Sequence, residues 1–160
     1  MVFQTADLCD DFIQQLQVAQ PGMNSYGGET HFCGPIETIR TYEDNTKVRQ
    51  LLETLGEGRV LVVDGGGSLG CALVGDRLAQ LAIDNGWAGI IVNGCIRDSG
   101  IIGKMNIGIK ALGTNPIKSI KQQRGEIGVE VFFQQVQWRP GDYVYSDEDG
   151  IVIAKESIVK

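Results

Sequence analysis

The chain has 160 residues, 42% of them hydrophobic and 21% charged, which predicts one globular domain over residues 1–160 with a packed core. The net charge is −6 and no run of lysine or arginine exceeds two residues, which argues against direct binding to nucleic acid. Acidic residues stand where a secretory signal has lysines, and no apolar run approaches about 18 residues, so we expect a cytoplasmic protein without a membrane segment.

The first third of the chain alternates helical and extended patterns. Apolar residues recur at helical spacing over residues 5–16, and Pro21 ends that segment. Residues 31–42 alternate as a strand does. A second helix is expected to begin at Asn45 and to have Gly56 at its C′ position.

A strand–helix–strand unit follows. Residues 59–63 and 88–92 are short and continuously apolar, as buried parallel strands are. Between them we expect a helix with Asp76 as its N-cap, ending at Asn85-Gly86.

The last third is rich in strands. After residues 107–112, four segments with strand composition are separated by short polar joins, with turn residues at Pro140-Gly141-Asp142 and Glu148-Asp149-Gly150. These features predict an antiparallel C-terminal half. The expected fold class is therefore α/β, with a central β-structure flanked by helices.

The cysteines and the single histidine carry no metal motif. The cysteines are widely spaced and form no C-x-x-C pair, so we expect free, buried thiols. No motif places an acid beside His31, which we expect to be structural. The four cysteines are Cys9, Cys33, Cys71 and Cys95.

The stretch VDGGGSLG, residues 63–70, contains a G-x-G-x-x-G pattern directly after an apolar segment. A dinucleotide site requires an acid about 20 residues later, at the end of the next strand, but Asn93 stands there. Gly75-Asp76 also interrupts any helix that would start at the loop. We therefore expect these glycines to allow a tight turn and a close approach of the backbone, and we consider an anion site at the helix that follows Gly75.

The anion site would form where two loops meet. The amides of Arg77 and Leu78 are expected to point outward at a helix N-terminus, which favours a small anion such as a carboxylate. Because the carboxyl ends of parallel strands lie at one edge of a sheet, Arg97 and Asp98 should meet the turn at Gly75.

Arg97 and Asp98 have complementary chemistry. A guanidinium binds a carboxylate in a bidentate manner, and an aspartate can hold Mg²⁺ or Mn²⁺ while water and substrate complete the octahedron. These residues therefore describe a metal-assisted site for a small 2-oxoacid. The alternative is a solvated ion pair in a loop.

Nearly the whole chain, from TADLCD to GIVIA, resembles the RraA-like family. The family includes the regulator of ribonuclease E activity A and the class II 4-hydroxy-4-methyl-2-oxoglutarate aldolases. The resemblance implies a swivelling β/β/α-type fold and a homotrimer with active sites near subunit interfaces. It also implies a divalent-metal aldolase that releases two pyruvates, with oxaloacetate decarboxylation as a second activity. The segments that carry it are VLVVDGGGSLGCALVGDRLAQLA, GIIVNGCIRDS, IGIKALGTNPIKS and RPGDYVYSDEDGIVI.

The aldolase members carry an Asp, twenty intervening residues and then Arg-Asp, a pattern met here by Asp76, Arg97 and Asp98. The resemblance implies that Arg97 binds substrate and acts in catalysis, that Asp98 is the metal ligand, and that Asp76 orients water on the metal. One position departs from the pattern, since Ile101 stands where many aldolases have an acid. The residues implied to contact substrate are Gly75, Asp76, Arg77, Leu78 and Arg97.

A second function, compatible with the first, is to bind and restrain a ribonuclease E-like protein. The ribonuclease regulators lack the aspartate of the Arg-Asp pair, so Asp98 favours the enzyme. Acidic segments could form the partner surface, although such charges usually form solvated faces. These acids are Asp10, Asp11, Glu43, Asp44 and residues 147–149.

Overall fold

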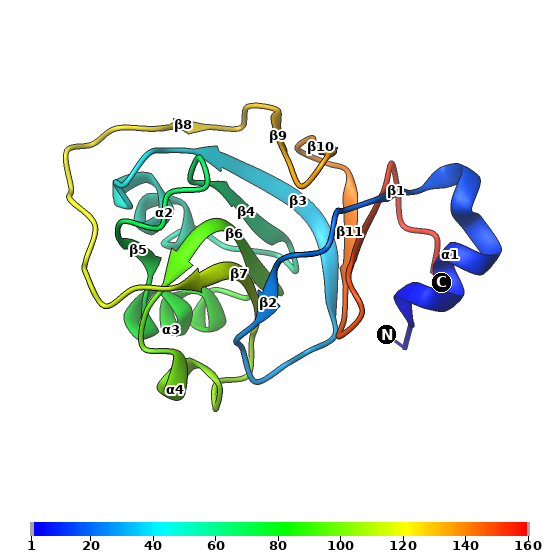
Figure 1. The fold of residues 1–160 in the computed structure, drawn as a ribbon, viewed down its shortest axis with the longest axis horizontal. Coiled ribbons are helices and arrows are strands. Elements are labelled where there is room, and N and C mark those ends of the chain that lie inside the picture. The colour runs from blue at the N-terminus through cyan, green and yellow to red at the C-terminus, as the bar shows by residue number, and fades with distance from the viewer. Residues whose placement is uncertain (1, 160) are drawn as a thin grey trace.

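The computed structural model describes residues 2–159, and its centre is one continuous β-sheet (Figure 1). The strand order is β1-β12-β11-β3-β4-β6-β7-β2, with β5 beside β6, β8 beside β3, and β9 and β10 in a separate hairpin. The helices are α1 (Thr5–Phe12), α2 (Thr46–Leu52), α3 (Asp76–Asp84) and α4 (Ser99–Ile102), with a 3₁₀ turn η1 (Ile13–Gln15). The strands are β1 (Gln17–Val18), β2 (Asn24–Ser25), β3 (Phe32–Arg40), β4 (Val60–Asp64), β5 (Ala72–Val74), β6 (Gly89–Ile96), β7 (Gly108–Thr114), β8 (Glu126–Ile127), β9 (Val131–Phe133), β10 (Val136–Trp138), β11 (Tyr143–Ser146) and β12 (Ile151–Ala154).

Strand β3 connects the two halves of the sheet. Its first part pairs antiparallel with β11, from Phe32 to Pro35, and its second part pairs parallel with β4, from Ile36 to Arg40. The antiparallel C-terminal strands therefore continue into the parallel strands in one sheet. This arrangement confirms the expected α/β class with a central β-structure and a strand-rich C-terminal half.

The parallel strands β4, β6 and β7 form the centre of the sheet, and the continuous apolar sequences of β4 and β6 predicted their burial. Helices α2 and α3 cover one face, where Leu52 and Leu78 pack against the sheet. The hairpin of β9 and β10 covers the other face, where Phe133 stacks on Trp138 with ring centroids 4.6 Å apart. Burial on both faces explains why these strands have no polar alternation.

Helix α1 packs on the antiparallel end of the sheet, at the right of Figure 1. Its Leu8 joins Phe3, Tyr145 and Val152 in a small buried cluster of its own. The two ends of the described chain lie here, far from α3 and α4 in the view.

Several predicted element boundaries shift. The first helix ends at Phe12 and continues only as the turn η1, and the strand expected over residues 88–92 extends to Ile96. The second helix follows Asn45 as predicted but ends at Leu52, so the assignment of Gly56 to the C′ position is wrong. A Cβ on Gly56 would collide with Trp87, so this glycine is required for close packing instead.

The glycine-rich loop forms a tight turn against β6. The N–H groups of Gly65 and Gly67 both donate to the carbonyl of Asn93, each at a distance of 3.1 Å. A Cβ on Gly65 would lie 2.7 Å from Leu73 Cδ1 and 2.8 Å from the Asn93 oxygen. The loop leads into β5, which the sequence had not revealed as a strand. Because these amides are used internally, the loop has no phosphate cradle of the dinucleotide type.

Cys9, Cys71 and Cys95 are free thiols, of which Cys71 and Cys95 are buried and Cys9 is half-buried. Cys33 is also half-buried, and the Tyr143 hydroxyl donates to its Sγ at 3.9 Å. Among the helices of residues 2–159, none combines the length and the apolar character needed to cross a membrane.

Candidate active site

The parallel strands bring two loops together at their carboxyl ends. The turn from β5 into α3 and the turn from β6 into α4 line one cavity of about 680 Å³. All six site residues expected from the sequence line this cavity. It is lined by Asn45, Arg49, Ala72, Gly75, Asp76, Arg77, Leu78, Arg97, Asp98, Lys118, Ser119 and Lys121.

The N-terminus of α3 is capped by a different residue from the one predicted. Gly75, not Asp76, is the N-cap, and Asp76 is the first helical residue. The carboxylate of Asp98 supplies the capping contact, because its Oδ2 accepts the N–H of Asp76 at 2.9 Å. Gly75 is needed at this point, since a Cβ there would lie 2.8 Å from the same Asp98 oxygen. The helix end therefore orients a carboxylate of the protein itself.

The backbone of Asp98 is unusual. It has φ 59° and ψ 35°, the left-handed region, which aspartate tolerates better than most residues. The N–H of Asp76 lowers the pKa of Asp98, burial acts against it, and the charge of Arg97 lowers the pKa further. Asp98 is thus held as a carboxylate beside a second carboxyl group.

The cavity is cationic although the chain is acidic. Five cationic side chains and two carboxylates line it, in a chain whose net charge is −6. Such a concentration of positive charge attracts anionic ligands, while the two carboxylates remain as oxygen donors. Arg49 also pairs with Glu53 at 3.3 Å, but that carboxylate is not among the lining residues.

Sequence analysis missed half of this lining. Lys118, Ser119 and Lys121 come from residues 115–125, which we call the strap, between β7 and β8. Asn45 and Arg49 come from the start of α2. The pair Lys118 and Lys121 is a basic feature of an acidic chain, but nothing in the sequence places the strap beside α3.

The donor set suits a hard divalent cation. Asp76 and Asp98 offer carboxylate oxygens, and the cavity leaves space for water and a substrate. Mg²⁺ is typically held by one or two carboxylates, with water and substrate oxygens completing the shell. Ile101 contributes nothing here, because it is 56% exposed on α4 and lies outside the lining.

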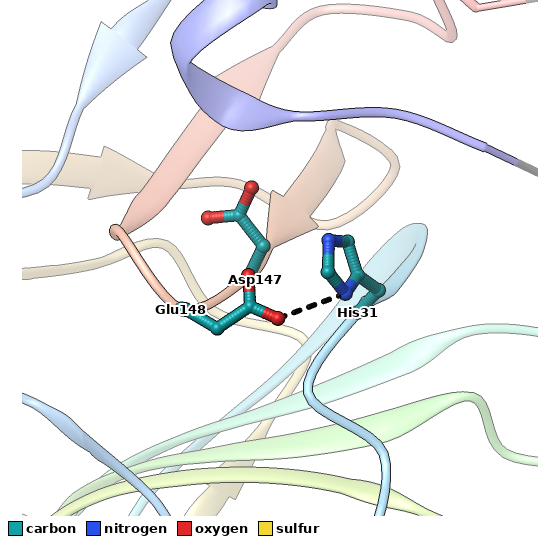
Figure 2. A group of neighbouring side chains, drawn as sticks. All are labelled: His31, Asp147 and Glu148. Atoms are coloured by element: carbon teal, nitrogen blue, oxygen red, sulfur yellow. Dashed lines mark ion pairs between the residues drawn. The ribbon is translucent and has the colours of Figure 1, made fainter.

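A second group of acidic residues surrounds His31, near the start of β3 (Figure 2). Ligand-type atoms of His31, Asp147 and Glu148 all lie within 4.8 Å of one another. Glu148 points to the ring, with Oε1 at 3.2 Å from His31 Nδ1, whereas the Asp147 carboxylate points toward the N-terminal segment.

The Asp147 carboxylate is already saturated by hydrogen bonds. Oδ1 accepts the Thr5 hydroxyl at 2.6 Å and the N–H groups of Asp149 and Gly150, and Oδ2 accepts the Thr5 N–H at 2.7 Å. The ammonium of Lys110 donates to the Asp147 carbonyl at 2.7 Å and places a positive charge nearby. This group is consequently a poor cation site. Glu148 is an acidic partner of His31 that no sequence motif predicted, and a structural role for His31 stays a prediction.

The chain is similar to a known family over nearly its whole length. The family model described as RraA-like: Aldolase/RraA matches residues 5–153. A protein of Laribacter hongkongensis, provisionally named 4-hydroxy-4-methyl-2-oxoglutarate aldolase, is 52% identical over 99% of this chain and 100% of its own length. A similarly named protein of Aromatoleum aromaticum is also 52% identical, over the same shares.

Solved structures share the fold. A Geobacillus kaustophilus protein titled S-adenosylmethionine: 2-dimethylmenaquinone methyltransferase has a TM-score of 0.96 and 52% identity, covering 98% of this chain and 97% of its own. The RNA-processing inhibitor RraA of Thermus thermophilis has a TM-score of 0.94 and 40% identity, covering 100% of this chain and 98% of its own.

Proposed function

This chain belongs to the RraA-like (Aldolase/RraA) family, and from that premise we propose that it is a divalent-metal-dependent aldolase. The proposed reaction cleaves 4-hydroxy-4-methyl-2-oxoglutarate to two pyruvates, with oxaloacetate decarboxylation as a second activity. The observation that carries the proposal is the meeting of Arg97 and Asp98 with the N-terminus of α3 in one cationic cavity.

The cavity suits a substrate with two carboxylates. Arg97 is proposed to bind the 2-oxoacid end, since a guanidinium matches a carboxylate in a bidentate manner. The turn at Gly75, Asp76, Arg77 and Leu78 lies against the same space. Lys118 and Lys121 line it from the strap, where they can neutralise the second carboxylate.

Bond cleavage requires stabilisation of an enolate. The substrate hydroxyl loses its proton, the bond between C3 and C4 breaks, one pyruvate leaves as a ketone, and the other leaves as an enolate that takes a proton at C3. A divalent cation on Asp98 would supply charge stabilisation at the 2-oxo and carboxylate oxygens. The Asp76 carboxylate is proposed to accept the hydroxyl proton, directly or through water, and Arg97 to stabilise the developing charge.

Loss of CO₂ from oxaloacetate leaves the same pyruvate enolate. A site that stabilises this enolate therefore serves both reactions, because the interactions that strengthen as the charge develops are shared. Mg²⁺ and Mn²⁺ both suit the oxygen donors.

The methyltransferase title of the Geobacillus kaustophilus protein does not suit this cavity. A quinone is large and apolar, whereas Ala72 and Leu78 are the two apolar side chains among the lining residues. The glycine-rich loop also has Gly65 and Gly67 bonded to Asn93. Methyl transfer to an apolar quinone is therefore disfavoured at this site.

The family resemblance supports a proposal for the assembly and the location of the protein. We propose a homotrimer with the cavity near the subunit interface. Free thiols and a small anionic metabolite as substrate favour the cytoplasm.

Ribonuclease restraint is the second candidate, favoured by the likeness to the RNA-processing inhibitor of Thermus thermophilis. The structure corrects its proposed surface. Asp44 and Asp147 are buried, so they cannot contact a partner, and Glu43 is half-buried with its carboxylate on the Ser68 hydroxyl at 2.6 Å. Asp10, Asp11, Glu148 and Asp149 remain exposed. Pull-down with a basic ribonuclease scaffold segment at low salt tests this candidate, and absence of binding rejects it.

The aldolase is tested by coupling pyruvate release to lactate dehydrogenase, with and without Mg²⁺, on both substrates. We expect release that requires the metal and disappears with a chelator. Release that is equal without metal, or absent with every divalent cation tried, would refute the proposal.

A further inference from the structure

The strap carries cations of the proposed site, and the buried carboxylate of Asp44 accepts two N–H groups from its second half. A third N–H, that of Gln123, donates to the hydroxyl of Thr46 at 3.2 Å, and that hydroxyl in turn donates to Asp44. Asp44 is fully buried, directly before the start of α2. Its Oδ2 accepts the N–H of Gln122 at 2.8 Å and the N–H of Arg124 at 3.2 Å. Its Oδ1 accepts the N–H of Thr46 at 2.9 Å and the Thr46 hydroxyl at 2.7 Å. One side chain therefore ties the strap to the helix.

The charge of Asp44 is stabilised in this position. Burial alone would raise the pKa of Asp44, but the four donors from Thr46, Gln122 and Arg124 outweigh it and lower the pKa to about 2. Charge-assisted hydrogen bonds of this kind are stronger than neutral ones. Asp44 is therefore a carboxylate near neutral pH.

Lys121 depends on this contact more than Lys118 does. The backbone of Lys118 forms an isolated parallel β-bridge with Ala72 of β5. The hydroxyl of the next residue, Ser119, accepts the N–H of Asn45 at 3.2 Å. Lys121 lies next to Gln122, whose N–H is one of the two that Asp44 accepts. On the other side of Lys121, one bond from the Ile120 N–H to the Glu43 carbonyl, at 3.2 Å, holds the chain.

We propose that Asp44 is a positioning residue of the active site, whose carboxylate fixes the strap so that Lys121 faces the substrate cavity. This inference rests on the proposed function, since it assigns Lys121 to the binding of the anionic substrate. Asp44 itself does not line the cavity and acts through the strap.

Asp147 provides a matched control. It is also buried, at 1% exposure, and also accepts four hydrogen bonds, but these hold the N-terminus of α1 and its own turn. Replacement of Asp147 should therefore disturb a carboxylate of the same kind without touching the strap. The four variants to compare are Asp44→Ala, Asp44→Asn, Asp147→Ala and Asp147→Asn.

The first measurement is amide hydrogen exchange in the protein without substrate. We expect Asp44→Ala to accelerate exchange at Gln122 and Arg124 and Asp147→Ala to leave both amides unchanged. Asp44→Asn keeps one acceptor oxygen, so its exchange rates at these two amides should lie between those of Asp44→Ala and the unchanged chain. Asp44→Asn also replaces Asp44→Ala in the comparison if Asp44→Ala does not fold. Unchanged exchange in both position-44 variants would overturn the proposal.

The second measurement is a double-mutant cycle on metal-dependent pyruvate release. We expect Asp44→Ala to raise KM about tenfold with kcat within about twofold, and to add nothing to KM when Lys121→Met is already present. Additive effects on KM, or an equal rise in Asp147→Ala, would overturn the proposal. If the unchanged chain releases no pyruvate, the proposed function fails separately, and the affinity for oxalate with Mg²⁺ replaces KM in the same cycle.

Discussion

Two groups of acidic side chains lie near opposite ends of the parallel strands, and they use their oxygens in different ways. In the group around His31, the Asp147 carboxylate is filled by four donors of the protein and Lys110 stands beside it. In the cavity, Asp98 accepts the N–H of Asp76, and the two carboxyl groups face open space among cations. Closeness of ligand atoms is therefore a weaker criterion for a metal site than the number of oxygens that remain available.

The same comparison explains the pKa shifts. In both groups hydrogen-bond donors lower the pKa of the aspartate, through the N–H of Asp76 for Asp98 and through Thr5, Asp149 and Gly150 against burial for Asp147. At Asp147 the donors serve folding, because they join α1 to the turn between β11 and β12. At Asp98 a single helix N-terminus orients the group toward the cavity, which suits a functional carboxylate.

The largest expected effect is at Asp98. Asp98→Asn keeps an oxygen for the Asp76 N–H but removes the charge, so we expect metal-dependent pyruvate release to fall at least about a hundredfold. Steady-state kinetics over a range of Mg²⁺ concentrations would measure it, with Asp147→Asn as the control of equal chemistry. Comparable losses of pyruvate release in Asp98→Asn and Asp147→Asn would contradict the assignment of metal binding to Asp98 and not to the His31 group.

A smaller effect is expected at Arg97. Arg97→Lys keeps the positive charge but loses the planar pair of donors, so KM should rise about tenfold while binding of Mg²⁺, followed by calorimetry, stays the same. Its control is Arg77→Lys on the exposed first turn of α3, which should change KM less. A larger rise in KM for Arg77→Lys than for Arg97→Lys would indicate that the substrate carboxylate binds to Arg77 instead of Arg97.

Asp147 should affect stability instead of activity. Asp147→Asn leaves at least one of its donors without an acceptor, and we expect the free energy of unfolding to fall by about 2–3 kcal/mol near neutral pH. Because the pKa of Asp147 is lowered on folding, its stabilisation is present above the unfolded pKa and is lost as pH falls through the folded pKa.

Urea denaturation between about pH 7 and pH 3 would measure that difference. The difference in the free energy of unfolding between the unchanged chain and Asp147→Asn should become smaller as the pH falls toward about 3. A gap that stays constant with pH, or a variant with lost activity at full stability, would contradict the assignment of Asp147 to folding.

The sequence was most informative where burial is complete on both sides. The apolar segments that became β4 and β6 can only be central strands, and their shared edge then predicts that Arg97 and Asp98 meet Gly75. The two buried aspartates show the limit of this reasoning. Asp44 looked like a surface charge because its donors, Gln122 and Arg124, lie 78 and 80 residues further along the chain.

Local sequence was misleading for short elements too. β5 has three residues directly after a glycine-rich loop, so it shows no periodicity. Asp76 has the chemistry of an N-cap, yet the carboxylate of Asp98 supplies the contact from a distant loop, which leaves the Asp76 side chain to face the cavity. The strap has no pattern of its own, and its place depends on hydrogen bonds to α2 and β5.

The smallest expected effect is at Glu148, the exposed member of the His31 group. Its ion pair with His31 joins side chains that are 55% and 35% exposed, so Glu148→Gln should change the free energy of unfolding by less than about 0.5 kcal/mol. Because Asp147 has no free oxygen, the variant should also leave Mg²⁺ affinity and pyruvate release unchanged. Calorimetric titration of Mg²⁺ into Glu148→Gln and Asp98→Asn separates the two groups directly: binding lost in the first and kept in the second would place the cation at His31.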